Sequence, residues 1–300
     1  MKIFTKNEYS ALKSVLLGSV DHFAWPRGDT AFDKSISESD FSHCFDHTVD
    51  DHVLDEARED LDRLQRELEK RSITVIRPSA DRSNWAYSAR DILFTHGDKM
   101  IQSPTPYASR SSESRLYKEL ESVNVIQAPR PIKEHDPIFD AANICKFNDC
   151  LLYLESSTGN RAGAEWLQKT LDTEVVVWNG VYAFAHIDST LASLNQDTIL
   201  VNARRVKSNQ IPKFLQDKKK IWVEEIAERS YVKFPFASAW IGMNVLSIDP
   251  ETVVVDDIQT KLIQQLEDNG FNVIALPMRQ SRTLGGGFHC VTCDLERECE

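Results

Sequence analysis

A cysteine that follows three consecutive glycines is the best candidate for a nucleophile in this sequence. It is Cys290, and the glycines are Gly285, Gly286 and Gly287. Because glycine tolerates positive φ and lets the backbone approach a ligand, the pattern predicts a stiff turn that presents the sulfur directly before a short strand. Most free cysteines are packing residues, so on this segment alone a buried bend is the alternative.

Further polar residues stand at the openings of successive predicted hairpins. They are Asp91, Asp140, His186 and Asp188, and Cys290 occupies the matching place in the last repeat. If the repeats surround an axis, equivalent positions converge on it and these side chains line one pocket. Taken singly, Asp140 could cap a turn, His186 could be a core histidine and Asp188 could bind backbone amides. Because they occur at equivalent positions of successive repeats, together they favour a catalytic site.

A pocket of this kind suits a planar guanidinium. A pair of carboxylates holds a guanidinium by paired charge-assisted hydrogen bonds. The bound cation would favour the thiolate of Cys290 by lowering a thiol pKa that is ordinarily about 8.5. Attack on the guanidinium carbon creates a leaving amine that must be protonated, and His186 is the natural general acid and then base.

The elements that would position these residues recur at intervals of roughly fifty residues. Five extended apolar segments close the copies and predict strands buried in a sheet, at residues 73–78, 123–129, 174–178, 220–224 and 271–277. Hairpin patterns occur at residues 92–101, 144–154 and 245–255, with a weaker one at 191–201. The first repeat is the least regular, and residues 15–18 are its best strand candidate.

Helices are predicted between the hairpins and the closing strands. Two are clear, one between Asp50 and Lys70 and one that ends before Gly270. Five hairpin-helix-strand units predict a closed, pseudo-fivefold α/β arrangement in one domain over residues 1–300, because an open odd unit would expose a sheet edge. A doubly wound α/β sheet is the alternative, but the sequence contains neither Gly-x-Gly-x-x-Gly nor a P-loop motif.

Composition narrows the class of protein. An apolar fraction of 41% over 300 residues is ample for a buried core. The net charge of −11 disfavours binding to nucleic acid or to an anionic membrane, and suits a cationic substrate. With no signal peptide and no segment long enough to span a membrane, the six cysteines predict reduced thiols in a cytoplasmic protein.

One long polar connection, at about residues 22–50, interrupts the repeats. Connections of this length are typical of functional lids or of disordered segments. His43, Cys44, His47 and His52 lie in it or just after it, but their spacing fits no standard zinc signature, so solvated loop residues are the favoured reading. Cys290 and Cys293 form a C-x-x-C pair that lacks a second pair or a following helix.

Three blocks of the sequence resemble the signature of the arginine amidinotransferases, in the pentein superfamily of guanidine-modifying enzymes. The blocks are residues 139–143, 186–190 and 284–294, and the last reads Leu-Gly-Gly-Gly-Phe-His-Cys-Val-Thr-Cys-Asp. The resemblance implies a five-bladed α/β propeller of ββαβ repeats. It also implies transfer of the amidino group of L-arginine to an acceptor amine through an amidino-cysteine, with release of L-ornithine and without metal or cofactor.

Roles for individual residues follow from the resemblance. Carried over by motif, Cys290 is the nucleophile, His186 is the proton shuttle, and Asp140 is the partner of His186 and a guanidinium ligand. Asp188 and Asp91 match further carboxylates on the guanidinium side.

The resemblance also covers the rest of the substrate. Arg205 falls where the family has an arginine on the substrate α-carboxylate, although Arg204 is adjacent, and Ser238 falls at a substrate-contact serine. Asn143 stands where the animal glycine enzymes have a second aspartate, and Val291 replaces a tryptophan. These departures leave glycine, lysine, a diamine or a pathway-specific amine open as acceptor, with a phosphorylated one disfavoured by the acidic charge.

Two other classes of function stay open. In an arginine deiminase or dihydrolase of the same fold, water and not an amine resolves the thiol adduct, and the nucleophile, histidine and carboxylates are common to both. A catalytically silent binding protein is disfavoured by the intact set of Cys290, His186 and Asp140. The family often forms dimers, so a homodimer is a possible assembly.

Overall fold

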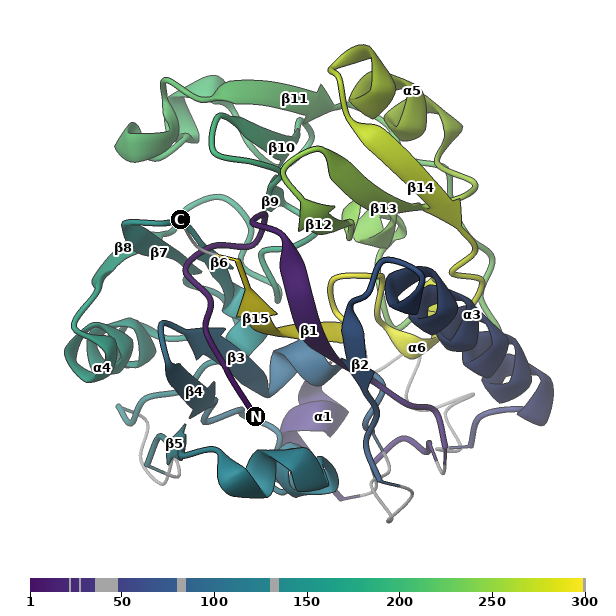
Figure 1. The fold of residues 1–300 in the computed structure, drawn as a ribbon. Helices are drawn as coiled ribbons and strands as arrows, with labels where there is room; N and C mark the ends of the chain where they lie inside the picture. The colour runs from purple at the N-terminus through teal and green to yellow at the C-terminus, as the bar shows by residue number, and fades with distance from the viewer. Residues whose placement is uncertain (22, 27, 36–47, 80–84, 130–134, 299–300) are drawn as a thin grey trace.

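Five three-stranded sheets surround a common centre in the computed structural model, which describes residues 1–21, 23–26, 28–35, 48–79, 85–129 and 135–298 (Figure 1). In every sheet the middle strand is antiparallel to the inner strand and parallel to the outer one. Four of the sheets are therefore one hairpin followed by a crossover strand, and the fifth takes its inner strand from the opposite end of the chain. This arrangement confirms the predicted pseudo-fivefold α/β propeller.

Four of the sheets are built from consecutive segments of the chain. They are β3 (Leu93–His96), β4 (Lys99–Gln102) and β5 (Val125–Gln127); β6 (Ile144–Lys146), β7 (Cys150–Leu154) and β8 (Glu174–Trp178); β9 (Leu191–Ser193), β10 (Thr198–Asn202) and β11 (Lys219–Val223); and β12 (Leu246–Asp249), β13 (Thr252–Asp256) and β14 (Asn272–Leu276). The four predicted hairpins, including the weak one, and the closing strands of these sheets are confirmed.

The fifth sheet combines the two ends of the chain. Its inner strand is β15 (Thr292–Arg297), its middle strand is β1 (Leu12–Leu17) and its outer strand is β2 (Thr74–Ile76). Leu17 pairs with Thr292 in antiparallel register, and β1 runs parallel to β2. The first repeat looked irregular in the sequence because its inner strand comes from the opposite end. This sheet closes the ring.

Helices fill the crossovers of only three sheets. They are α3 (Asp51–Glu69), α4 (Arg161–Leu171) and α5 (Thr260–Asp268), which lie against the outer strands β2, β8 and β14 (Figure 1). The crossovers before β5 and β11, described throughout, contain only 3-10 turns, at residues 108–122 and 208–215. The regular repeat expected from the sequence therefore has two shortened members.

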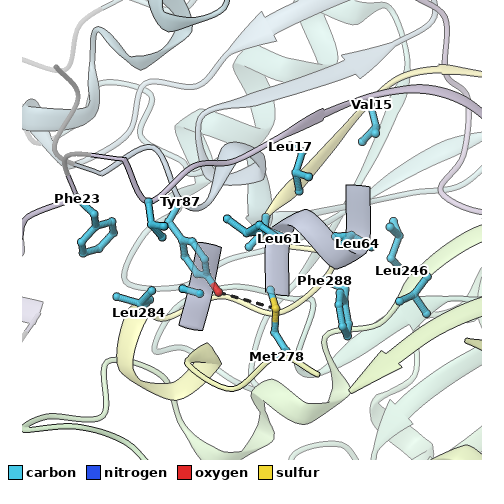
Figure 2. Packing of buried hydrophobic residues seen from close by; sticks show 14 of the residues in the cluster. Val15, Leu17, Phe23, Leu61, Leu64, Tyr87, Leu246, Met278, Leu284 and Phe288 are labelled. Carbon is cyan, nitrogen blue, oxygen red and sulfur yellow. Dashed lines mark hydrogen bonds between the residues drawn. The ribbon is translucent and has the colours of Figure 1, made fainter. Parts of the chain in front are cut away.

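The nucleophile segment is anchored in the same core as the closing sheet. Val15 and Leu17 of β1 pack in one cluster with Leu61 and Leu64 of α3 and with Phe288 (Figure 2). Tyr87, in this cluster, donates its hydroxyl proton to the carbonyl oxygen of Gly286 at 3.2 Å. Two segments far from each other in sequence thus hold the turn that precedes Cys290.

Part of the long polar connection at residues 22–50 is buried where the structure describes it. It contains α1 (Thr30–Ser35), whose Phe32 is fully buried. The Phe32 ring lies 5.1 Å from Trp85 and 5.7 Å from Phe236, between ring centroids. Residues 36–47, which include His43, Cys44 and His47, lie outside the described part of the chain.

Charged side chains occupy the centre of the propeller, where the inner strands meet. Asp294, Arg90, Lys146, Arg297 and Glu8 are all buried, and together we call them the axial charge network. Asp294 accepts hydrogen bonds from Arg90 Nη2 at 2.7 Å, Arg297 Nε at 2.8 Å and Lys146 Nζ at 3.4 Å. These cations hold the pKa of Asp294 well below its ordinary value, although burial alone would raise it. None of the helices in the described ranges has the length and apolar content needed to cross a bilayer.

We predict that Asp294→Asn lowers the free energy of unfolding by about 3–5 kcal/mol, because it leaves three buried cations without their shared anion. Urea denaturation followed by circular dichroism measures the change. Glu296→Gln, two residues away on β15, is the matched control, because the Glu296 side chain is partly exposed and pairs only with the exposed Lys2. We expect less than about 1 kcal/mol for the control. Equal losses in the two variants would contradict the stabilising role of Asp294.

Candidate active site

The polar residues that the sequence brings into register lie at one end of the propeller axis. Asp91 ends a 3-10 turn before β3, and Asp140 is the N-cap of the turn before β6. Asp188 precedes β9 and Cys290 precedes β15. Asp91, His186, Asp188 and Cys290 line one cavity of about 510 Å³, and Asp140 contacts His186 from behind.

The turn that carries Cys290 depends on the glycines that precede it. Gly285 has a φ of +80°, which L side chains rarely adopt, and a Cβ on Gly287 would lie 2.6 Å from the Cβ of Asn244. Asn244 in turn fixes the turn by two bonds: its side-chain oxygen accepts from the Cys290 N–H at 2.9 Å, and its carbonyl accepts from the Phe288 N–H at 3.1 Å. The predicted stiff turn is confirmed.

Cys290 is a protonated thiol in the free protein. Its side chain is 3% exposed, and Sγ donates to Oδ2 of Asp188 at 3.2 Å. Burial, followed by the negative charges of Asp188 and Asp91, raises the pKa of the thiol well above its ordinary value. A cation that entered the cavity would offset both carboxylates and favour the thiolate.

His186 lies between two carboxylates. Nε2 lies 3.0 Å from Oδ2 of Asp140, and Nδ1 lies 3.6 Å from Oδ1 of Asp91. Burial opposes the charged imidazole, but the charge of Asp91 and the hydrogen bond and charge of Asp140 outweigh it and raise the pKa of His186 to about 9. At neutral pH His186 is therefore an imidazolium that can donate a proton. The Asp140 side chain makes no capping hydrogen bond, so it does not stabilise the 3-10 turn that follows it.

Two oxygens of the carboxylates that flank His186 have no hydrogen-bond partner among the described residues. They are Oδ1 of Asp91 and Oδ1 of Asp140, and both are buried. Burial raises the pKa of Asp91, although His186 and Arg110 oppose it. Because unpaired buried acceptors are uncommon and cost free energy, these oxygens suit a ligand that brings N–H donors and positive charge.

Arg110 orients Asp91 and was not found by sequence reasoning. Nη1 donates to Oδ2 of Asp91, while Nε and Nη2 donate to the carboxylate of Glu113 at 3.0–3.2 Å. The guanidinium also lies over the Trp85 ring, 4.7 Å from its centroid. Burial raises the pKa of Glu113 to about 7 against the effect of Arg110. The surrounding Ser-Arg-Ser-Ser-Glu sequence is typical of an exposed loop, so no local signal identifies this buried arginine.

Of the two residues predicted to contact the rest of the substrate, Ser238 lines the same cavity, whereas Arg205 is not a lining residue but contacts Ser238 and Ser189, which are. Nη2 of Arg205 donates to Oγ of Ser238 at 3.1 Å, and Nη1 donates to Oγ of Ser189 at 2.9 Å. Tyr182 stacks on the guanidinium, 3.7 Å from ring centroid to Cζ. The adjacent Arg204 instead donates to the carbonyl of Glu224. Arg205 is thus the arginine that faces this group.

The mouth of the cavity is largely aromatic. Its walls include Trp85, Tyr107, Phe234, Phe236 and Phe184, which is 58% exposed. Besides Arg110, two basic residues line the cavity, Lys34 from α1 and Arg282. The connection at residues 22–50 therefore contributes to the rim of the cavity.

The cysteine and histidine groups that suggested a metal or dithiol form no such site where the structure describes them. Cys293 is buried, and its Sγ bonds to the carbonyl of Leu93 and not to Cys290. Within the described ranges, no three histidine, cysteine or acidic residues are grouped so that they could hold a metal ion. His43, Cys44 and His47 are outside these ranges.

Comparisons with known proteins point to one family. A family model described as arginine deiminase matches residues 214–297. Inosamine-phosphate amidinotransferase 1 of Streptomyces glaucescens is 34% identical over 97% of this chain and 95% of its own length. L-arginine:L-lysine amidinotransferase of Pseudomonas savastanoi pv. phaseolicola is 25% identical over 97% of this chain and 93% of its own. The solved inosamine-phosphate amidinotransferase of Streptomyces griseus superposes with a TM-score of 0.92 at 32% identity, and the match covers 99% of this chain and 97% of that one.

We predict that Asp188→Asn speeds alkylation of Cys290 by iodoacetamide at pH 8 by about tenfold, because it removes an anion that raises the pKa of the thiol. Mass spectrometry of the peptide that contains Cys290 measures the rate. Asp197→Asn, in an exposed turn, is the control and leaves the rate unchanged. An unchanged or slower rate in Asp188→Asn would contradict this account of the thiol.

Proposed function

This chain belongs to the amidinotransferase family, and on that premise we propose that it moves the amidino group of L-arginine to a small primary amine. The transfer passes through an amidino-cysteine on Cys290 and releases L-ornithine. The observation that carries the proposal is that Oδ1 of Asp91 and Oδ1 of Asp140 are buried without a hydrogen bond among the described residues, and that Asp91 lines the same cavity as the thiol of Cys290. A guanidinium supplies the charge and the N–H donors that this site lacks.

The guanidinium binds among three carboxylates. Its N–H groups donate to the unpaired oxygens of Asp91 and Asp140 and to the carboxylate of Asp188. These bonds are charge-assisted, and the planar fork of a guanidinium matches carboxylates in a way that an ammonium does not. With the cation in place, the negative field that holds Cys290 as a thiol is offset, and the thiol proton passes to solvent as the thiolate forms.

The chemistry proceeds in two half-reactions. The thiolate of Cys290 attacks the guanidinium carbon and forms a tetrahedral adduct. The imidazolium of His186 protonates the leaving nitrogen as its bond to carbon breaks, which frees ornithine and leaves a cationic amidino-thioether. Neutral His186 then takes a proton from the ammonium of the acceptor. The acceptor nitrogen attacks the amidino carbon and loses its second proton, and the carbon–sulfur bond breaks, so that this proton restores the thiol of Cys290.

The amino-acid end of arginine binds at Arg205 and Ser238. The Arg205 guanidinium contacts Ser189, Thr190 and the ring of Tyr182, so its orientation is restricted before any ligand binds. A guanidinium fixed in this way matches a carboxylate by paired hydrogen bonds. We therefore assign the substrate α-carboxylate to Arg205 and Ser238.

The acceptor enters the same cavity after ornithine leaves, since its nitrogen must reach the carbon held on Cys290. The aromatic mouth offers apolar faces, and Lys34 and Arg282 offer positive charge to an anionic group on the acceptor. These local cations matter more to a bound ligand than the net charge of the chain, because exposed charges further away are screened. Relatives whose names specify an inosamine phosphate or L-lysine set the panel of acceptors to test, together with glycine.

The proposal is tested by incubating the protein with L-arginine, with and without each amine, and quantifying ornithine, citrulline, ammonia and urea. We expect ornithine to accumulate only with an amine, together with the matching guanidino product. Citrulline and ammonia from arginine alone would instead establish a deiminase, the activity named by the family model that matches residues 214–297. Ornithine with urea would establish hydrolysis.

We predict that Cys290→Ala abolishes turnover in this assay and retains arginine binding, measured by isothermal titration calorimetry. The carboxylates that bind the guanidinium are unchanged in this variant. Cys293→Ser is the matched control and keeps its activity, because Sγ of Cys293 bonds only to a backbone carbonyl. An active Cys290→Ala protein would overturn the mechanism.

We predict that ornithine release in a single turnover slows as pH rises through about 9, because His186 must be protonated to serve as the acid. Asp140→Asn removes an anion that stabilises the imidazolium, so the alkaline limb of the profile moves to lower pH. Rapid-quench measurements between pH 6 and 10 check both statements. An alkaline limb that stays in place in Asp140→Asn would exclude His186 as its source.

A further inference from the structure

His289, the residue before the nucleophile, is buried between two carboxylates. Nδ1 lies 3.2 Å from Oδ2 of Asp188, and Nε2 lies 3.5 Å from Oε2 of Glu8. The side chain is 8% exposed and is not part of the cavity wall. Its side chain therefore touches neither the thiol nor a ligand in the cavity, and the reaction proposed above gives it no task.

The two contacts favour a ring in which both nitrogens carry a proton. A neutral imidazole would turn one lone pair toward a carboxylate oxygen, whereas an imidazolium donates from both nitrogens. The groups that face the ring are Asp188, Glu8 and Arg90, whose Nε donates to the His289 carbonyl at 3.0 Å. Burial and Arg90 oppose the charge on the ring, but the two carboxylates outweigh them and raise the pKa of His289.

Asp188 links this histidine to the nucleophile. Its Oδ2 accepts from both His289 Nδ1 and Cys290 Sγ, each at 3.2 Å. Burial would raise the pKa of Asp188, but His289 and then His186 hold it far below its ordinary value. These contacts favour the anionic form of Asp188, which can bind a cation.

We propose that His289 is a positioning residue, an imidazolium that bridges Asp188 and Glu8, keeps the Asp188 carboxylate aimed at the sulfur, and offsets its charge there. Glu8 comes from the N-terminal segment, which Phe4 ties to β15 and Thr5 ties to the β3–β4 turn. A series of contacts thus runs from Cys290 in the cavity through Asp188 and His289 to Glu8. Glu8 belongs to the axial charge network and lies 3.6 Å from Arg90. The inference rests on the proposed function only in taking Cys290 as the nucleophile.

The first test is alkylation of Cys290 by iodoacetamide without any substrate, so it does not depend on transferase activity. We expect His289→Gln to slow alkylation at pH 8 by about tenfold, because loss of a nearby cation raises the pKa of the thiol further. A residue that only packs would give the opposite sign, since a loosened turn exposes the thiol and speeds alkylation. His96→Gln is the control: this half-buried histidine contacts Thr173, away from the site, and its replacement leaves the rate unchanged.

The second test reads the histidine itself and covers the case in which His289→Gln fails to fold. In protein labelled with nitrogen-15 at histidine, we expect the His289 resonances to report a doubly protonated ring at pH 7. Glu8→Gln keeps the shape of the side chain and removes its charge, so the His289 titration moves to lower pH. A neutral His289 at pH 7, or a titration that Glu8→Gln leaves in place, overturns the proposal. Faster alkylation in a folded His289→Gln protein also overturns it.

Discussion

The inner strands of the five sheets have one edge that no neighbouring strand covers, and the structure depends on how those backbone groups are satisfied. Side chains of the axial charge network donate some of the hydrogen bonds that these backbone groups need. Arg90 donates to the Thr292 carbonyl of β15, Arg297 to the Ser247 carbonyl of β12, and Lys146 to the Thr95 carbonyl of β3. Three buried cations then require buried anions, because an uncompensated charge in the interior is costly. Asp294 and Glu8 supply them.

The same network holds the site at the end of the axis. The backbone N–H of Arg90 donates to the Cys290 carbonyl, and its Nε donates to the His289 carbonyl. The nucleophile turn is thereby attached to the centre of the molecule as well as to Asn244. The carboxylates that line the cavity are held in place by other side chains before any ligand arrives, which suits a cation.

Much of the fold could be predicted from the sequence because it is local. Hairpins and closing strands have apolar patterns within a few residues, and Asp91, Asp140, Asp188 and Cys290 stand at equivalent places in them. Contacts between distant segments left no such pattern. Examples are the pairing of β1 with β15 and the contact of Glu8 with His289. The burial of Arg110 is another, because its local sequence is typical of a surface. The polar composition of residues 22–50 gave no indication of the aromatic contacts that Phe32 of α1 makes.

The closing sheet also sets the order in which the protein is made. Thr292 of β15 follows its partner Leu17 by 275 residues. At about 5–20 residues per second, β1 leaves the ribosome about 15–55 s before the strand that pairs with it. For that time the apolar Val15, Leu16 and Leu17 lack one side of their sheet, so a newly made chain has a segment that chaperones could bind. Cys290 emerges in the same late interval. The carboxylates of the proposed site therefore exist without the proposed nucleophile until the ring can close.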